Sequence, residues 1–288
     1  MKFIYKVFVN LVEGENLISF KTENSSLEIK LFYRREPLEY AHHIRVLYVV
    51  CNDDNGDFQA PSDSNNSCDS ALKRISLNVK LLQSLMSEIL FKKFGVHKTF
   101  QFIKKDLVCE LFKSNLNLDQ ALNMESRDLF LYLAKEIASN SDLFAKDCKY
   151  VAVLSFTRYD PSLKTNSNDI FENLKGFCAL GAEWLAVYGT ASLYTWPESL
   201  KDLRICLNDY TVIDETKFIN DTAFRNTRWA AYSTSLGSLL HELSHIFDLG
   251  HNKSGIMARG FDDLFAFFTV NFNNCFCYKN INVIKSIQ

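Results

Sequence analysis

The sequence predicts an α+β fold, in which a mixed β-sheet carries helices mainly on one face. Apolar residues make up 47% of the 288 positions, charged residues 23%, and the net charge is −2, a balance typical of a globular domain with a sizeable core. Patterns typical of buried strands and of helices follow one another in the order strand, helix, helix, strand, strand, helix. No linker rich in Pro, Gly or Ser interrupts residues 42–263. We therefore expect one main domain, with a boundary near residue 40.

The first 40 residues are predicted to form a separate N-terminal β-rich segment. Short apolar runs alternate there with the turn-forming stretches EGEN and TENSS, which indicates two to four strands. The next stretch, HHIRVLYVVC (42–51), is apolar at nearly every position, as in a strand that is buried on both faces. Residues 52–70 are rich in Asp, Asn and Ser and are predicted to form a loop.

Two helices are expected next. Apolar residues recur every three or four positions from Leu72 to Ile89, with Asp69 or Ser70 as the N-cap and Gly95 as the stop. A second helix is predicted over residues 124–138. Its inward-facing residues are Leu129, Tyr132, Leu133 and Ile137.

The second half is predicted to hold more strands and a last helix. YVAVLSFTR (150–158) is typical of a buried strand, and residues 177–197 of one or two strands broken near Gly189. A polar connection over 214–228 precedes a helix that is expected to begin near Ser233 or Thr234.

That last helix carries the stretch HELSHIFDLGH (241–251), which contains three of the six histidines in the chain. His241 and His245 are four residues apart, so their imidazoles lie on the same helix face and can both reach one metal ion at about 2.0–2.1 Å. Glu242 lies about 100° further round the helix. It can approach a water on the metal but cannot easily act as a third ligand.

His251 reaches the same ion only if the chain turns back after about residue 247. The DLG segment (248–250) provides such a break, because Asp and Gly both tolerate a positive φ. Three histidines leave one tetrahedral position open, which distinguishes a catalytic zinc site from a closed structural one. Zn²⁺ is therefore the predicted cofactor.

The motif resembles that of the metzincin clan of zinc metallopeptidases, whose signature is H-E-x-x-H-x-x-G-x-x-H followed by a methionine-containing turn. Five residues match it position for position: His241, Glu242, His245, His251 and Met257. Asp248 stands where the clan has glycine. The sequence leaves open whether the tight turn stays at Asp248 or moves to Gly250.

Three stretches together, GTASLYTWP, HELSHIFDLGH and GIMARGFDD, resemble an uncharacterised eukaryotic zinc metallopeptidase family within that clan, over roughly residues 42–265. The resemblance implies a zincin-like twisted sheet, an active-site helix and a short C-terminal subdomain after the third histidine, with Met257 beneath the metal. It also implies that an extended peptide pairs with an edge strand, which we expect at 189–197. The catalytic domain would span 41–288. The sequence leaves open whether it is truncated at its C-terminus, because the clan continues there with a packed helix.

These features predict a zinc-dependent peptidase in which Glu242 takes a proton from the attacking water and passes it to the leaving amine. Two alternatives remain: a catalytically silent zinc-binding scaffold that holds a peptide, and a truncated product without function. No basic excess suggests nucleic acid as a partner. No signal peptide and no apolar run of about 18 residues is present, which indicates a cytoplasmic protein that does not span a membrane. The oligomeric state stays open.

Overall fold

The computed structural model describes residues 7–22, 25–34, 43–104, 107–163, 169–269 and 282–286. Contacts divide the chain into a larger unit, residues 42–265, and a smaller unit formed by residues 1–41 and 266–288. The predicted boundary near residue 40 lies beside this division. The division differs from the predicted domain 41–288 in one respect, because residues 266–288 group with the N-terminal segment.

The smaller unit contains a three-stranded antiparallel sheet in the order β11-β1-β2. β1 (Gly14–Thr22) and β2 (Ser25–Tyr33) form a hairpin. β11 (Asn282–Ser286) pairs with the other edge of β1. The C-terminal segment is thus joined to the N-terminal one by backbone hydrogen bonds, a pairing between distant segments that local sequence patterns do not reveal.

The larger unit is built on a mixed sheet in the order β4-β3-β6-β10-β9, in which β5 also pairs with β3. Its strands are β3 (His43–Val50), β4 (Gln101–Phe102), β5 (Cys109–Lys113), β6 (Cys148–Leu154), β9 (Ala179–Ala182) and β10 (Leu185–Gly189). All pairings are parallel except that of β9 with β10. A short ribbon of β7 (Arg158–Tyr159) and β8 (Leu174–Lys175) lies outside this sheet. The predicted α+β fold with a mixed sheet is confirmed.

The described helices are α1 (Cys68–Phe94), α2 (Leu118–Asn123), α3 (Ser126–Ser139), α4 (Leu200–Cys206), α5 (Arg228–His245) and α6 (Phe265–Phe268), with 3₁₀ turns η2 (Ile170–Asn173), η3 (Leu193–Thr195) and η4 (Arg259–Asp263). α1 stops where the sequence predicts. Gly95 has a φ of 73° and its N–H donates to the Phe91 carbonyl at 2.8 Å. The N-cap is Ser67, which lies before both predicted candidates and accepts from the Ser70 N–H.

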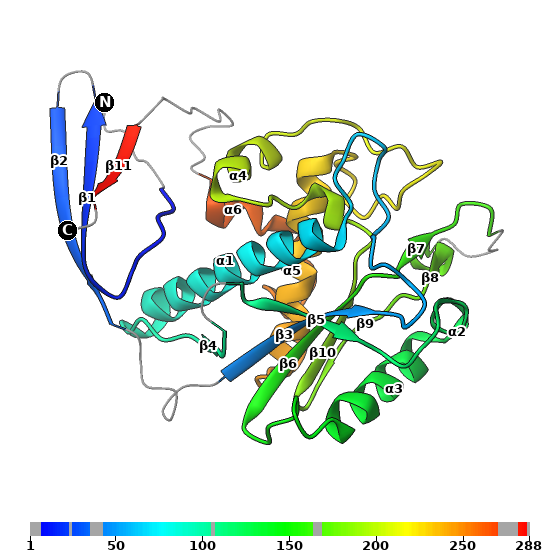
Figure 1. Cartoon of the computed structure of the whole chain (residues 1–288). Helices are drawn as coiled ribbons and strands as arrows, with labels where there is room; N and C mark the ends of the chain where they lie inside the picture. Colours follow the sequence, from blue (N-terminus) through cyan, green and yellow to red (C-terminus); the bar gives the residue numbers. More distant parts are fainter. Residues whose placement is uncertain are drawn as a thin grey trace. The chain divides into compact units, whose positions relative to one another are not determined.

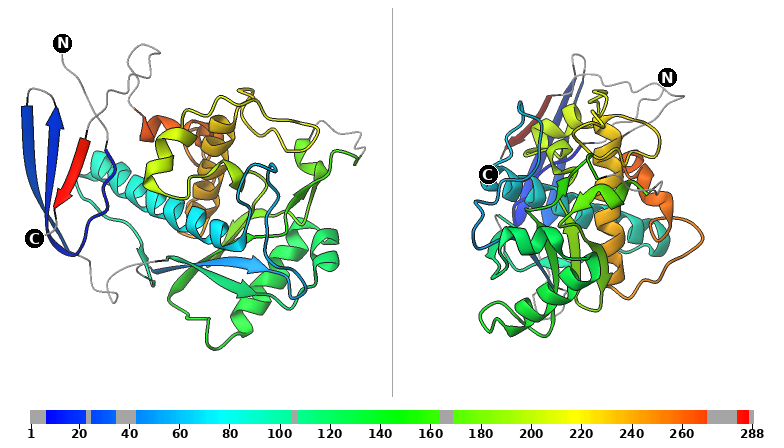
Figure 2. Two further views of the ribbon diagram at one scale, coloured as in Figure 1. Left: turned by 45° about the horizontal axis from the view of Figure 1, so that its top comes forward. Right: turned by 90° about the vertical axis from the view of Figure 1, so that its right-hand side faces the viewer.

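Helices cover both faces of the main sheet (Figures 1 and 2). One face packs against α2 and α3 in a core that includes Leu47, Leu133 and Ala152. α1 and α5 lie together on the opposite side, where the Tyr232 hydroxyl donates to the Asn78 side chain at 2.7 Å. The sequence predicted helices mainly on one face, whereas the structure has them on both. Strands that are apolar at successive positions need cover on both faces, and β3 is of this kind.

The segment 177–197 differs from its prediction. Its break lies at Glu183, which has a φ of 53° in the turn between β9 and β10, and not at Gly189. The edge strand predicted at 189–197 is wrong, because β10 pairs with β6 on one side and with β9 on the other. The residues that follow β10 are buried in the turn that contains η3, where Pro197 accepts a hydrogen bond from Asn78 of α1. The edge on this side of the sheet is β9.

α5 begins at Arg228, earlier than the predicted start near Ser233. The sequence predicted a polar connection up to residue 228 and left residues 229–232 outside the helix. The Trp229 ring packs at 4.8 Å from Phe265, and residues 230–236 of the first turns are buried. α5 is therefore a core helix over most of its length, which fixes the position of its histidines.

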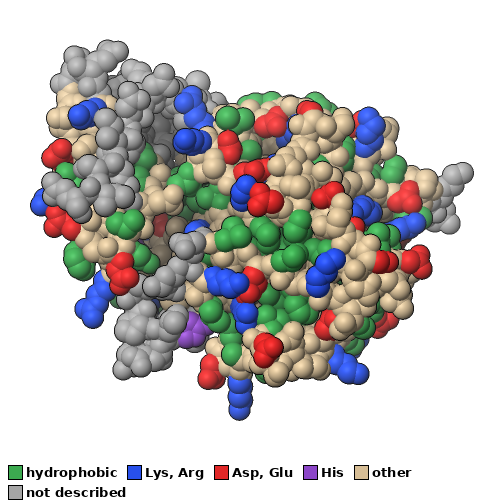
Figure 3. Space-filling view, viewed as in Figure 1, with side chains coloured by type: hydrophobic (Ala, Val, Ile, Leu, Met, Phe, Trp, Pro, Cys, Tyr) green, Lys and Arg blue, Asp and Glu red, His purple; other side chains and the backbone are tan. Residues whose placement is uncertain are grey.

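Charged residues are mixed in sign on the face shown in Figure 3, where Lys and Arg side chains are interspersed with Asp and Glu. The overall charge of −2 is consistent with this mixture. This face carries no concentration of positive charge of the kind that binds a phosphate backbone.

Candidate metal centre

The chain doubles back immediately after α5. Asp248 adopts a left-handed conformation, with a φ of 63°. The Leu249 N–H donates to the Ser244 carbonyl at 3.2 Å, and the Asp248 N–H to the His245 carbonyl at 3.0 Å. Of the two turns that the sequence allowed, the structure has the one at Asp248, because Gly250 has no positive φ. Asp tolerates this conformation better than most residues with a Cβ.

This turn brings the three histidines together. The Nε2 atoms of His241 and His245 are 3.1 Å apart, and each lies 3.2 Å from Nε2 of His251. Four ligands around a tetrahedral zinc ion at about 2.0–2.1 Å are about 3.3–3.4 Å from one another. The three nitrogens therefore have the spacing needed to bind one metal ion.

Backbone carbonyls orient two of the three rings. Nδ1 of His241 donates to the Ile256 carbonyl at 2.7 Å, and Nδ1 of His245 donates to the Leu249 carbonyl at 2.8 Å. A carbonyl oxygen only accepts, so the proton of each neutral ring lies on Nδ1 and the lone pair on Nε2. Lone pairs that converge at this distance repel one another unless a cation lies between them. The donor set thus suits a metal ion in its chemistry as well as in its spacing.

The segment after His251 returns to pack on α5. Met257 is half-buried in this return, and its carbonyl accepts from the Asn252 N–H at 2.9 Å. Two residues near Met257 contact His241. Ile256 supplies the carbonyl to His241, and the Phe261 ring lies edge-on to the same imidazole, with centroids 5.5 Å apart.

Gly237 allows this segment to approach the helix so closely. A Cβ on Gly237 would overlap the carbonyl oxygen of Phe261 and lie 2.8 Å from its carbon. Sequence reasoning did not single out Ile256, Phe261 or Gly237. A glycine four residues before the first histidine was the only visible signal of this close packing.

Glu242 is buried beside the edge strand β9. The backbone of Glu242 packs closely against Gly181 of β9. A Cβ added to Gly181 would overlap the Glu242 carbonyl oxygen and lie 3.0 Å from the Cβ of His245. Burial raises the pKa of the Glu242 carboxyl from 4.5 to about 7, and a hydrogen bond from the Gly181 N–H and the proximity of His251 lower it less strongly. A carboxyl group with this pKa can both accept and return a proton near neutral pH.

Replacing Gly181 by Ala is expected to lower the free energy of unfolding by roughly 1–3 kcal/mol and to reduce metal affinity, because the new methyl group pushes β9 away from α5. Gly250→Ala is the matched control, since nothing lies within 4 Å of a Cβ added there. Denaturant unfolding of the two variants provides the comparison. Equal stability of Gly181→Ala and wild type would show that this packing has no structural effect.

The metal-free protein is expected to lose stability as pH rises toward neutral. The folded-state pKa of Glu242, about 7, lies above its ordinary value of 4.5, so folding favours the protonated carboxyl. The stabilisation is fully present below about pH 4.5 and is lost as pH rises through 7. The difference between the two pKa values corresponds to roughly 3 kcal/mol.

Melting temperatures measured with chelator at pH 5 and pH 8 test this expectation when wild type is compared with Glu242→Gln. The variant keeps all the histidines, so the difference between the two pH curves isolates the carboxyl group. Wild type should lose more stability than the variant over this interval. Parallel curves would contradict the expectation.

A family model described as "Putative peptidase family" matches residues 2–284 of this chain. The chain belongs to this peptidase family. The match extends across the larger unit and most of the smaller one, so the family model includes both the metal centre and the N-terminal strands.

A curated relative of this family member comes from Saccharomyces cerevisiae and is named "Putative zinc metalloproteinase YIL108W". The two are 24% identical over 297 residues, which cover 90% of this chain and 41% of the yeast protein. The chain therefore spans less than half the length of that relative. The name of the yeast protein agrees with the predicted metal.

Among solved structures, OgpA from Akkermansia muciniphila matches at a TM-score of 0.44 and 14% identity, over 74% of this chain and 49% of OgpA. A catalytically inactive OgpA in complex with an O-glycopeptide substrate matches with the same values.

Two further observations concern the described parts of the chain. In the ranges that the structure describes, no helix is both long and apolar enough to cross a bilayer. The six described cysteines are free thiols: Cys51, Cys68, Cys109, Cys148, Cys178 and Cys206.

Proposed function

We propose that this chain is a zinc-dependent peptidase that hydrolyses peptide bonds with water. The observation that carries the proposal is the convergence of the Nε2 atoms of His241, His245 and His251 to within 3.2 Å beside a buried Glu242. Membership of a peptidase family supports the reaction class, and the name of the yeast relative supports the metal.

The three histidines would hold the ion through neutral imidazoles. This donor set suits zinc and leaves one tetrahedral position open, as catalytic sites require. A bound zinc would lower the pKa of a coordinated water and polarise the substrate carbonyl. The carbonyls of Leu249 and Ile256 support the ligands by fixing the proton of two rings on Nδ1.

Glu242 is the general base in this proposal. Its carboxylate takes a proton from the attacking water and then delivers it to the nitrogen of the leaving amine. In the metal-free site, burial raises the pKa of the Glu242 carboxyl to about 7, and the Gly181 N–H donates a hydrogen bond to it. In this proposal the same carboxyl group serves both proton transfers.

The substrate would lie along β9. This short strand ends the sheet next to α5 and is half-buried over Ala179–Ala182, so it can pair with an extended peptide. The substrate position is thus moved from the predicted 189–197 to the hairpin strand that precedes it. The match to the H-E-x-x-H signature, with His251 and the Met257 turn, supports assignment to the metzincin clan.

A defined peptide pool tests the proposal. The purified chain should cut peptides when it is loaded with zinc, lose this activity with a chelator, and regain it when zinc is restored. Mass spectrometry of the products provides the readout. Stoichiometric zinc without cleavage of any peptide would contradict peptidase activity and select the alternative, a zinc-binding scaffold that holds a peptide.

A further inference from the structure

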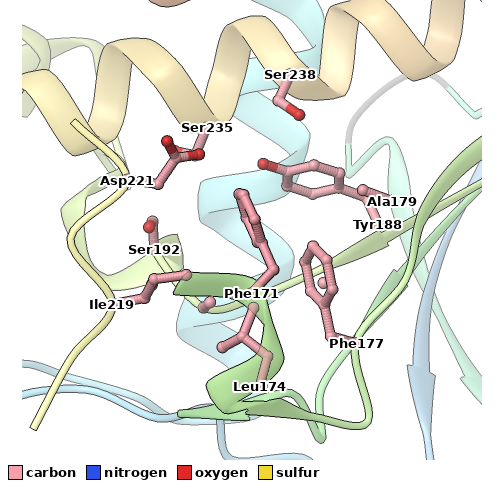
Figure 4. A pocket seen from close by; sticks show the side chains of 12 residues that line it. Phe171, Leu174, Phe177, Ala179, Tyr188, Ser192, Ile219, Asp221, Ser235 and Ser238 are labelled. Atoms are coloured by element: carbon pink, nitrogen blue, oxygen red, sulfur yellow. The ribbon is translucent and has the colours of Figure 1, made fainter. Parts of the chain in front are cut away.

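A side-chain pocket opens beside the candidate catalytic residues. Its volume is about 190 Å³, and it is enclosed by α5, the β9–β10 hairpin and the segment around Ile219 (Figure 4). The walls are largely aromatic, formed by Phe171, Phe177 and Tyr188. Asp221 contributes a carboxylate to this lining. The pocket thus combines apolar walls with one acidic group.

Two elements connect the pocket to Glu242. Ser238 of α5 lines it and lies one helical turn before Glu242 on the same face. Ala179 of β9 also lines the pocket. It lies two residues before Gly181, whose N–H donates a hydrogen bond to the Glu242 carboxyl. The Tyr188 hydroxyl hydrogen-bonds Ser238 and lies close enough to interact with the charges of both Asp221 and Glu242. The pocket therefore adjoins the general base along both elements.

The direction of β9 assigns the pocket to one side of the cleaved bond. A peptide that pairs antiparallel with β9 runs from Ala182 toward Ala179, and antiparallel pairing is the more stable kind. The bond beside Glu242 then lies near Gly181. The residue that follows this bond lies nearer Ala179, which lines the pocket. The pocket would thus receive the side chain on the carboxyl side of the cleaved bond.

The carboxylate of Asp221 is only partly neutralised. Its side chain is 19% exposed and its Oδ1 lies 3.5 Å from Nη2 of Arg259. Arg259 also donates to Asp262 at 3.2 and 3.3 Å, while Arg225 pairs with Asp263 at 3.3 Å. In the ion pairs of the described residues, these three carboxylates thus share two guanidinium groups. Burial raises the pKa of Asp221, and Arg259 opposes this effect without cancelling it.

We propose that this pocket selects a lysine or arginine side chain immediately after the cleaved bond, with Asp221 as the residue that determines this preference. The long aliphatic stem would pack against the rings of Phe171, Phe177 and Tyr188. The terminal cation would form an ion pair with the Asp221 carboxylate. This inference rests on the proposed peptidase function and adds a substrate class to it.

Cleavage-site mapping tests the preference. The zinc-loaded chain is incubated with a peptide library in which every residue occurs at each position, and the cuts are read by mass spectrometry. Lys and Arg should be about tenfold enriched over Met directly after the cut. Asp221→Asn should abolish the enrichment, and Asp221→Lys should shift it toward acidic residues.

Asp209→Asn is the matched control, because Asp209 is also a partly buried aspartate that faces one arginine, with 29% side-chain exposure and Arg228 at 3.9 Å. It should keep the preference for Lys and Arg. Cleavage without enrichment of Lys and Arg, or an enrichment that survives in Asp221→Asn, would overturn the inference while the peptidase function stands.

A binding measurement keeps the two proposals separate. Zinc-loaded Glu242→Gln, with Asp221 intact, is titrated with fluorescent peptides that differ only in Lys or Met at the pocket position. The Lys peptide should bind about tenfold more tightly. Equal affinities would overturn the inference, even if Asp221 variants do not fold. Absence of cleavage by wild type together with tighter Lys binding would refute the peptidase function and retain the pocket assignment.

Discussion

Replacing Glu242 by Gln is expected to lower kcat/KM for peptide cleavage by about a thousandfold. Gln has nearly the same size and fits the buried position against β9, but its amide cannot accept a proton from water. General-base catalysis contributes about 10²–10⁴ to the rate, which sets the size of the loss. Steady-state cleavage of a fluorogenic peptide, with wild type and variant at the same zinc occupancy, measures it.

Zinc content is the essential control for this variant. Glu242 is not among the three residues whose ligand atoms converge, so zinc bound per chain should stay at the wild-type value. Glu242→Asp keeps a carboxylate but withdraws it by one methylene, and its loss of rate should be smaller. Wild-type turnover by Glu242→Gln would exclude Glu242 as the proton carrier.

The second large effect is expected when His251, the third proposed zinc ligand, is replaced. His251→Ala is expected to weaken zinc binding by at least about a hundredfold, because even the loss of a group that only supports a ligand costs about 10–100-fold. His241 and His245 remain on α5, but two imidazoles do not complete the site. Peptide cleavage should fall in parallel at limiting zinc. Competition with a chromogenic chelator measures the affinity.

His97→Ala is the matched histidine control. The His97 ring is exposed and stacks on Phe91 with centroids 4.0 Å apart, outside the metal centre. Its loss should leave zinc affinity and cleavage unchanged. If His251→Ala bound zinc as tightly as His97→Ala, the ion would not be held by the three converging imidazoles.

Local spacing predicted the features that depend on local geometry. Helical periodicity put His241 and His245 on one face, and the tolerance of Asp248 for a left-handed conformation allowed His251 to join them. The stop of α1 at Gly95 follows from the same kind of rule. Each of these features is decided within a few residues of chain, so the sequence was sufficient.

Features that depend on distant pairing could not be predicted. An apolar run such as 177–197 does not indicate which of its strands lies at an edge, because this depends on the pairing of β10 with β6. The break at Glu183 is a non-glycine residue with a positive φ, which no simple rule selects. The sequence also gave no sign that β11 pairs with β1, since residues far apart in the chain meet there.

The same limit applies to the surroundings of the metal centre. The carbonyl groups of Leu249 and Ile256 orient two histidines, but every residue has a carbonyl group and the sequence cannot mark the ones that are used. Gly181 and Asp221 were overlooked because their partners lie on other elements. The convergence of the three histidines was thus predictable from local spacing, whereas the residues that position their rings required the structure.

The most direct test is a crystal structure of the zinc-loaded protein with anomalous data collected at the zinc absorption edge. We predict one zinc ion per chain, about 2.0–2.1 Å from Nε2 of His241, His245 and His251, with the Glu242 carboxylate beside the open coordination position. An ion bound elsewhere, or a His251 ring directed away from the other two imidazoles, would contradict the account.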